Sequence, residues 1–395
     1  MSETCDVAVI GGGPSGSYAA FLLASAGTRV AVIERKDGAV SAPCCTGVVG
    51  KGYADLVGVE PDCVVADASS AVFISPSGRR LRVESPVSQA LVLDRALLER
   101  RLLERAAGVG AHVRAGTVVL RIDRRDSGFE LLLAGPASRE VVHARALVVA
   151  GGVGPGLTRQ IGLGATQRYL VGAHAEIEMD DVSETEIYLL QDVARGLFAW
   201  LVPVGGHLVR VGVLGPRSAK THVGRFLERP EVRRRLRERE IPITQRPVPV
   251  SPLRRTYADG LIVIGDAAGQ VKPTTGGGLY FGAIAARAGA DVVGQALAAG
   301  DLSSKVLSGY ERRWKSDFGS ELRRGSRVRR IYGHLSPRQV DTVIDWAARR
   351  HIADELLESP SFSFDWHSGT LMAGLTRGLL GPLARPRLPR VGGSK

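Results

Sequence analysis

The feature that most constrains the fold is a glycine-rich turn near the N-terminus, in the stretch "VIGGGPSGSYAA". Residues 5–35 follow the hydrophobic pattern of a buried strand, a helix and a second strand. Gly11, Gly13 and Gly16 stand between the first strand and the helix in the spacing G-x-G-x-x-G. Such a turn brings a pyrophosphate against unpaired N–H groups at the helix N-terminus, so the sequence predicts an α/β protein that binds a dinucleotide.

An acidic residue supports this prediction. Glu34 ends the second strand, where its carboxylate is expected to accept hydrogen bonds from both ribose hydroxyls of an adenosine and to repel a 2′-phosphate. Ser15, in the turn, and Arg35, after the acid, are assigned to the same cofactor site. These residues suit FAD and NAD equally, so they leave the choice open.

A second glycine-rich stretch, "GLIVIGDAAGQVKPTTGGGLYFGAIAA", distinguishes between the two cofactors. A predicted strand ends at Gly265 and Asp266, and three consecutive glycines precede an alanine-rich helix. This arrangement resembles the second nucleotide motif of FAD-dependent oxidoreductases. The resemblance implies that the aspartate binds the ribityl chain and that the helix N-terminus faces the flavin pyrimidine ring, which becomes anionic on reduction. The cofactor residues assigned here are Gly265, Asp266, Pro273, Gly276, Gly277 and Gly278.

A third segment, "LDRALLERRLLERAAGVG", has apolar residues at helical spacing and predicts an amphipathic helix that closes at Gly108. Its Asp-Arg start resembles the corresponding helix of the same FAD enzymes. The resemblance implies that Arg95 contacts the FAD phosphates or the ribityl chain. A surface arginine on a solvated helix is the alternative interpretation.

Composition places the chain among globular proteins, since 44% of its residues are apolar and 23% are charged, and 395 residues allow two or three domains. The N-terminus enters a strand without a signal-peptide pattern, and no uncharged run reaches the roughly 18 apolar residues of a membrane span, so we expect a cytoplasmic protein. Cys5, Cys44, Cys45 and Cys63 lack the spacing of a disulfide framework or a zinc site, and no metal is expected.

The net charge of +12 is concentrated late in the chain, in "RRWKSDFGSELRRGSRVRRIYG" and "GLTRGLLGPLARPRLPRVGGSK". Such segments attract anionic lipid or an acidic redox protein, or they form solvated helix surfaces. No recognition motif for nucleic acid accompanies the charge. We therefore expect a peripheral contact with the inner face of the cell membrane and no nucleic-acid partner.

Together, "PCCTG", "GLFAWLVPVGGHLVRVGV" and "GDAAGQVKPTTGGGLYFGAIAA" resemble the geranylgeranyl reductase family of FAD enzymes, which saturate isoprenoid C=C bonds. The likeness extends from residue 5 to about residue 330. It implies a Rossmann-type FAD-binding domain and an inserted antiparallel-sheet substrate domain of the p-hydroxybenzoate hydroxylase type, with a prenyl tunnel between the two. The helical pattern and basic charge after residue 301 predict a C-terminal helical region that associates with membranes. The expected domains are residues 1–66, 94–164 and 255–300 for FAD, 67–93 and 165–254 for substrate, and 301–395 for the helical region.

The same resemblance assigns residues around the flavin. The catalytic set is Cys44, Phe198 and Trp200, and the substrate-binding set is Cys45, Gly47 and Pro203. Simple packing is the alternative for Cys44, as a small apolar residue in a tight loop, and for Phe198 and Trp200, as aromatics of a sheet core.

The sequence departs from the family pattern at several positions. Arg195, Phe198 and Val202 stand where Pro, Tyr and Phe are expected in the signature P-x-x-Y-x-W-x-F-P, Cys45 occupies a slot typical of glycine, and Gly152 replaces an acid. The phenylalanine keeps a flat apolar wall but removes a hydroxyl, which puts a proton relay through that position in doubt.

These observations predict a reductase in which reduced flavin delivers hydride to a prenyl C=C bond of a geranylgeranyl lipid, prenyl diphosphate or polyprenyl quinone. Two alternatives stay open: a flavin monooxygenase or halogenase on the same fold, because "FAWLVP" resembles the halogenase W-x-W-x-I-P signature, and a non-catalytic FAD-containing lipid-binding protein. No second G-x-G-x-x-G motif is present, so NADPH, ferredoxin or a quinol remains possible as the electron donor.

Overall fold

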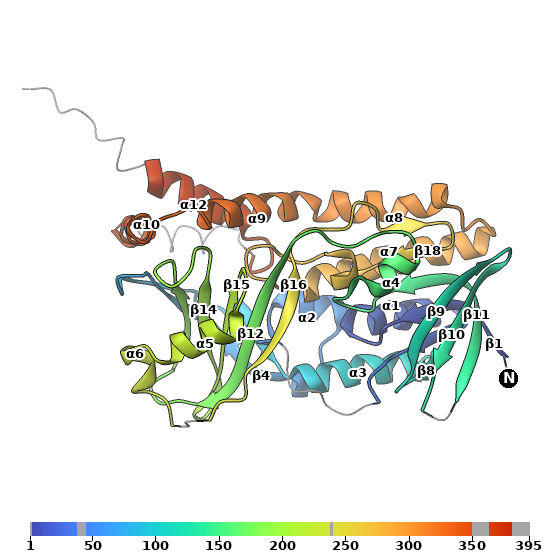
Figure 1. Cartoon of the computed structure of the whole chain (residues 1–395), viewed down its shortest axis with the longest axis horizontal. Coiled ribbons are helices and arrows are strands. Elements are labelled where there is room, and N and C mark those ends of the chain that lie inside the picture. The colour runs from blue at the N-terminus through green and yellow to red at the C-terminus, as the bar shows by residue number, and fades with distance from the viewer. Residues whose placement is uncertain (1, 38–44, 137, 238–239, 350–362, 381–395) are drawn as a thin grey trace, which may run out of the picture.

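The computed structural model describes residues 2–37, 45–136, 138–237, 240–349 and 363–380. The molecule is elongated. An eight-stranded sheet with its helices forms one end, a seven-stranded sheet forms the other, and C-terminal helices run along one long side across both (Figure 1). This architecture confirms the predicted fold class: a Rossmann-type α/β part, a second and largely antiparallel sheet, and a helical C-terminal region.

The eight-stranded sheet carries the glycine-rich turn. Its elements are β1 (Ser2–Ile10), α1 (Pro14–Ser25), β2 (Val30–Ile33), α3 (Arg95–Gly108), β8 (His112–Arg114), β9 (Val118–Arg125), β10 (Gly128–Ala134), β11 (Arg139–Val149), α4 (Pro155–Gln160), β17 (Tyr257–Ala258), β18 (Leu261–Val263) and α7 (Leu279–Ala299). The strand order is β17-β18-β11-β1-β2-β8, with the β9–β10 hairpin joined to β11. Val7, Ala8 and Val9 are fully buried, because α1, α3 and α7 cover one face of the parallel core while the hairpin and α4 cover the other.

The seven-stranded sheet forms the other end of the molecule. Its elements are β5 (Ser70–Ile74), β6 (Arg80–Glu84), β12 (Tyr169–Glu178), β13 (Thr185–Leu189), β14 (Phe198–Gly205), β15 (Leu208–Gly215), β16 (Thr244–Pro249), α5 (Ala219–Leu227) and α6 (Pro230–Arg233). The order is β16-β12-β15-β14-β13-β5-β6, antiparallel throughout except between β13 and β5. Ala199 and Leu201 pack with Phe226 of α5. Alternation along the strand therefore turns Phe198 and Trp200 to the opposite face.

A small three-stranded sheet is formed by strands on both sides of β5 and β6 in the chain. It has the order β3-β7-β4, and the elements around it are β3 (Val48–Gly50), α2 (Lys51–Val57), the 3₁₀ turn η1 (Pro61–Cys63), β4 (Val64–Ala68) and β7 (Ala90–Leu93). The predicted boundary between residues 66 and 67 falls inside β4. The predicted domain limits therefore remain a proposal.

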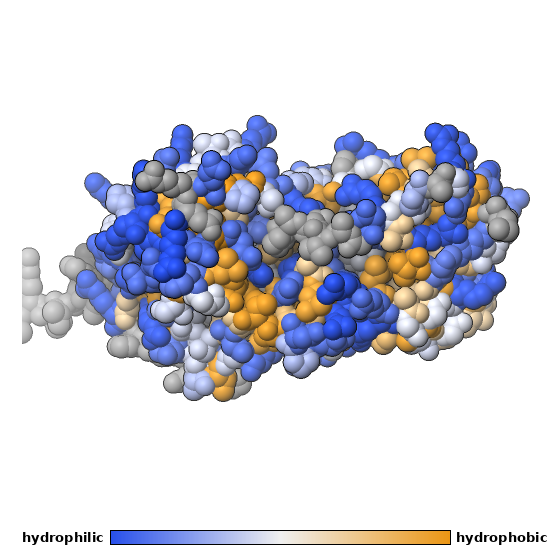
Figure 2. Space-filling model, turned by 90° about the horizontal axis from the view of Figure 1, so that it is seen from below, coloured by the Kyte–Doolittle hydropathy of each residue, from blue (hydrophilic) through white to orange (hydrophobic). Residues whose placement is uncertain are grey.

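The C-terminal region is helical, as predicted. Its helices are α8 (Ser304–Asp317), α9 (Gly319–Tyr332), α10 (Pro337–Arg349) and α12 (Ser368–Leu380). Tyr310, Trp314 and Phe318 are fully buried in the same core as α7, while α12 packs against α9 and α10. Within the described ranges, none of the helices combines the length and the apolar character that crossing a membrane requires. The face seen from below is mostly hydrophilic, with hydrophobic residues gathered near its middle (Figure 2).

Candidate functional site

The first glycine turn is shaped by two close approaches and one open position. Gly11 has φ +107°, and a Cβ there would lie 2.5 Å from the Ala150 carbonyl oxygen. A Cβ on Gly16 would overlap the Gly11 carbonyl oxygen, so this glycine is required for helix α1 to pack on β1. A Cβ on Gly13, in contrast, would meet no atom within 4 Å. Gly13 thus borders open space at the N-terminus of α1, where a ligand can approach the backbone.

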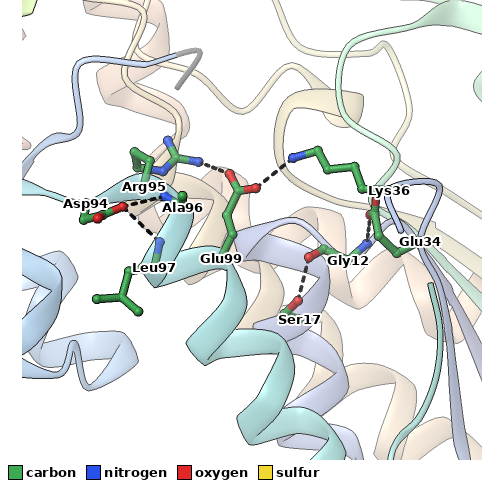
Figure 3. Close-up of polar contacts among 9 residues, drawn as sticks. All are labelled: Gly12, Ser17, Glu34, Lys36, Asp94, Arg95, Ala96, Leu97 and Glu99. Carbon is green, nitrogen blue, oxygen red and sulfur yellow. Dashed lines mark hydrogen bonds and ion pairs between the residues drawn. The ribbon is translucent and has the colours of Figure 1, made fainter. Parts of the chain in front are cut away.

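Glu34 is held against this turn. Its two carboxylate oxygens accept hydrogen bonds from the backbone N–H groups of Gly12, at 2.6 Å, and Lys36, at 2.8 Å (Figure 3). Each oxygen has a second lone pair, so the carboxylate retains capacity to accept hydroxyl donors. Arg35, which was assigned with it, is exposed.

Arg95 lies at the start of α3, beyond its N-cap Asp94, whose side chain accepts N–H groups of Ala96 and Leu97. Glu99 accepts a hydrogen bond from Arg95 at 2.7 Å and another from Lys36 at 2.9 Å, and thereby joins α3 to the Glu34 loop (Figure 3). Burial alone would raise the pKa of Glu99, but these two cations lower it below its usual value. The guanidinium is therefore anchored, rather than a loose surface group.

The second motif packs directly on the first. The strand that was predicted to end at Gly265 and Asp266 ends earlier, at Val263, because Gly265–Ala268 form a 3₁₀ turn, η2, that carries Asp266. A Cβ on Gly265 would lie 2.8 Å from Ser15 Oγ, and one on Gly282 of α7 would overlap the same oxygen. Ser15 is thus the point at which the N-terminal turns of α1 and α7 meet.

Asp266 lies beneath the N-terminus of α7, because a Cβ on Gly278 would be 2.6 Å from its carboxylate. The side chain is open to solvent, yet the protein atoms around it raise its pKa by desolvation, and Arg95 opposes this shift. Two residues that were predicted to hold FAD, far apart in the sequence, are therefore electrostatic neighbours.

Each of the three consecutive glycines faces a protein side chain. Besides Gly278 over Asp266, a Cβ on Gly277 would lie 2.9 Å from Lys272 Cε, and one on Gly276, where φ is +76°, would lie 3.2 Å from Leu214 of β15. The prediction explained these glycines by a flat ligand. The structure adds a second reason, since the turn between η2 and α7 is also closely packed on the protein side.

Sequence reasoning missed a buried ion pair beneath this turn. Lys272 Nζ lies 2.9 Å from Asp365, and the two side chains are only 6% and 3% exposed. The aspartate comes from the segment before α12, and its carboxylate fills the space that a Cβ on Gly50 would occupy. Pro273, the next residue of the turn, packs near α9, since a Cβ on Gly325 would lie 3.0 Å from its Cδ. The C-terminal region is therefore anchored at the candidate cofactor site.

His367 makes a second contact between the same two segments. Burial, with Lys272 adding to the effect, lowers the pKa of His367 to about 4, so the ring is neutral near pH 7. Its Nδ1 lies 2.7 Å from the Phe364 carbonyl oxygen and must carry the proton, which leaves Nε2 to accept from the Thr274 hydroxyl at 2.9 Å. The signal available in the sequence was "FDWHSG", in which Asp365 and His367 alternate with the aromatic residues Phe364 and Trp366.

The predicted aromatic residues share one face of the seven-stranded sheet. The rings of Phe198 and Trp200 lie 5.7 Å apart and are tilted by 46°. The indole covers Gly212 on β15, where a Cβ would overlap it. Phe198 is paired with Leu214, the residue that faces Gly276. Pro203, assigned to the same group, lies farther along β14, and strand alternation places it on the opposite face from Trp200.

The predicted cysteine loop is described only in part, and Cys44 lies outside the described residues. Gly47 has φ +81°, and its N–H lies 3.4 Å from Cys45 Sγ. Arg210, which sequence reasoning missed, donates at 2.8 Å to the carbonyl oxygens of Thr46 and Leu93 and pairs with Glu176 at 2.8 Å. The seven-stranded sheet therefore holds this loop in place. No cluster of potential metal ligands occurs in the described part of the chain.

Comparison with known proteins agrees with this geometry. The FAD binding domain family matches residues 4–313. A digeranylgeranylglycerophospholipid reductase of Methanothermobacter thermautotrophicus is 30% identical over 354 residues, which cover 86% of this chain and 90% of the relative. The chain belongs to the geranylgeranyl reductase family of FAD enzymes.

The solved structures agree in fold. A geranylgeranyl bacteriochlorophyll reductase-like protein from Thermoplasma acidophilum superposes with a TM-score of 0.85 at 22% identity, over 97% of this chain and 99% of that one. The flavin-dependent brominase Bmp2 is more distant, with a TM-score of 0.70 at 18% identity over 95% and 98%. As a member of the reductase family, this chain is an FAD-dependent oxidoreductase.

Proposed function

We propose that this chain saturates C=C bonds in the prenyl chains of a lipid. The observation that carries the proposal is the junction of Gly276 with Leu214, because it joins the second flavin motif to the face that bears Phe198 and Trp200. The relative's name supports a prenyl phospholipid as substrate. NADPH or ferredoxin is proposed as the electron donor.

The open space at Gly13 and the solvent-facing carboxylate of Asp266, beneath the N-terminus of α7, fit a flavin dinucleotide. Gly13, Glu34, Arg95 and Asp266 would hold FAD, which when bound and reduced supplies the hydride. An isolated alkene is not polarised, so the chain must align it and exclude water. Trp200 supplies a flat apolar surface for this purpose.

The test is anaerobic turnover. The FAD-loaded protein is reduced, by NADPH or by reduced ferredoxin in separate arms, and offered prenyl lipids and quinones. We expect mass gains of two units per saturated bond. Oxygen-dependent insertion into substrate would instead favour the monooxygenase or halogenase alternative, although Phe198 stands in place of the first tryptophan of the halogenase signature. Flavin that no donor reduces would favour a lipid-binding protein.

Trp200→Ala is expected to lower kcat for prenyl reduction by about tenfold to a hundredfold, because loss of the indole leaves the alkene poorly aligned. Flavin content and absorption spectrum should match the unchanged protein, since the indole covers Gly212 rather than the glycine turns. Trp200→Phe keeps a ring and should retain most of kcat. If Trp200→Ala turns over as fast as the unchanged protein, Trp200 only packs in the sheet and does not align the alkene.

We further propose that the C-terminal region binds anionic membranes, because a long prenyl chain is collected from a bilayer. Helix α12 carries Leu371, which is 37% exposed, and Arg377, and basic residues continue to the end of the chain. Each basic residue near an anionic surface contributes about 1 kcal/mol, which salt screens. Removing the residues after Thr370 should weaken binding to anionic liposomes at low salt.

This truncation leaves Asp365 and His367 in place, so FAD content should not change. Since α12 packs against α9 and α10, a purely structural helix is the competing interpretation. Equal liposome binding by the full-length and shortened proteins, or loss of flavin, would support it.

A further inference from the structure

Arg329 of α9 differs from the other enclosed arginines. Arg210 and Arg235 pair with Glu176 and Glu186 at 2.8 and 2.9 Å. The guanidinium of Arg329, by contrast, makes no ion pair or hydrogen bond with any residue that the structure describes. Its guanidinium lies over two aromatic rings, 5.7 Å from the centroid of Phe198 and 5.9 Å from that of Tyr332. It is a positive charge held between apolar surfaces.

The position of this charge is fixed by its neighbour on α9. The Tyr332 hydroxyl donates to the Leu197 carbonyl oxygen at 2.7 Å, just before β14, and the Tyr332 carbonyl oxygen accepts from the Gln191 amide. Gln191 Oε1 in turn accepts the N–H of Gly196 at 2.6 Å. The end of α9 is thereby tied to the loop that leads into Phe198.

A second donor lies on the same face. Trp200 Nε1 is buried and has no hydrogen-bond partner in the described part of the chain, and its ring is 5.7 Å from Phe198. A buried indole N–H usually finds an acceptor, and leaving a donor unpaired costs about 1–3 kcal/mol. The Arg329 guanidinium and the Trp200 ring are thus both neighbours of Phe198, each 5.7 Å from its ring centroid.

The guanidinium remains charged under ordinary conditions. Burial lowers the pKa of Arg329 to about 10, which is still well above neutrality, and only part of the side chain reaches solvent. Enclosing a charge without an opposite charge is costly, so such a group is best satisfied by an anion from outside the chain. A phosphoryl group suits it, because a guanidinium can bind two of its oxygens at once.

The location relative to the flavin motif is also suitable. Phe198 is paired with Leu214 on the neighbouring strand, and Leu214 faces Gly276. Adjacent strands are about 4.8 Å apart, so the ring beneath the guanidinium lies one strand spacing from the residue that packs on the second glycine turn. A lipid anchored there by its polar end can extend its prenyl chain along the sheet toward the flavin.

We propose that Arg329 binds the phosphoryl group at the polar end of the prenyl substrate. This inference rests on the proposed function, and it adds that the site selects phosphorylated prenyl compounds over neutral ones. The phosphoryl group belongs either to a prenyl diphosphate or to the headgroup of a prenyl phospholipid. Both present phosphoryl oxygens to the same guanidinium.

The test measures binding of three probes to the FAD-loaded protein: geranylgeranyl diphosphate, digeranylgeranylglyceryl phosphate and the neutral geranylgeraniol. The unchanged protein should bind at least one phosphorylated probe about tenfold to a hundredfold more tightly than the alcohol, the range of a charge-assisted hydrogen bond. The phosphorylated probe that binds more tightly identifies the source. Arg329→Gln should remove the preference, and Arg329→Lys should keep part of it. Affinity for the alcohol, FAD content and Tm should stay unchanged.

Arg323→Gln is the matched control, because Arg323 is exposed on the same helix. Its probe preference should equal that of the unchanged protein. The assignment of Arg329 is wrong if the unchanged protein prefers no phosphorylated probe or if Arg329→Gln keeps the preference. In either case, reduction of geranylgeraniol would still support the proposed function. If no prenyl probe binds or is reduced, both proposals fall.

Discussion

Gly13→Asp is expected to give a folded protein that purifies colourless, without FAD. A side chain at Gly13 meets no protein atom within 4 Å, and the residue caps α1 with extended backbone angles that any residue adopts, so the fold should tolerate the change. Aspartate is also a favourable N-cap. It would nevertheless fill the open space and place a negative charge where the pyrophosphate must approach. Flavin absorbance of the purified protein and the Tm of its FAD-free form provide the measurement.

Two other glycines make this experiment specific. Gly108→Asp, at the exposed end of α3, also introduces a side chain that meets no atom within 4 Å, and it should keep FAD. Gly16→Ala should lower Tm with or without cofactor, because its Cβ would overlap the Gly11 carbonyl oxygen. If Gly13→Asp binds FAD normally, the assignment of the first glycine turn to the cofactor site is wrong.

Asp365→Asn is expected to lower the free energy of unfolding by about 3–5 kcal/mol, because it leaves the buried Lys272 ammonium without its counter-charge. Lys272→Met should cost a similar amount for the converse reason. The double variant Lys272→Met/Asp365→Asn should recover much of the loss, since it buries no charge. Chemical denaturation of the four proteins closes a thermodynamic cycle and isolates the coupling between the two residues.

An exposed ion pair provides the control for this cycle. Arg313 and Asp291 lie 2.8 Å apart, like the buried pair, but their side chains are 45% and 42% exposed. Solvent screens such pairs, so Asp291→Asn should have a much smaller effect. Hydrogen exchange in α12 should increase in Asp365→Asn, because the pair holds the segment before this helix. If Asp365→Asn lowers the free energy of unfolding no more than Asp291→Asn does, the buried pair does not anchor the C-terminal region.

Local patterns in the sequence were sufficient for the nucleotide-binding part of the fold. A buried strand, a glycine turn and a helix form within a short stretch of chain, and the requirement for Gly11 and Gly16 arises from contacts inside that unit and with the adjacent strand. The same reasoning identified α3, α7 and the basic C-terminal helices. The place of Cys44 in the flavin site and the roles of the other assigned residues remain predictions. A resemblance shows which positions correspond, but it does not show what those residues contact.

Only the tertiary structure decided what each buried charge contacts. The ion pair joins Lys272 to Asp365, and the cation–π contact joins Arg329 to Phe198. The partners are far apart in the chain, and no periodicity relates them. Exposed and enclosed arginines look alike in a basic segment, although α9 contains both Arg323 and Arg329. A sequence pattern reports which face of a helix is apolar, but the ion pairs across that face depend on how separate elements pack. The glycines and the fold class were therefore determined by the sequence itself, whereas the buried ion pair and the unpaired guanidinium follow from long-range packing.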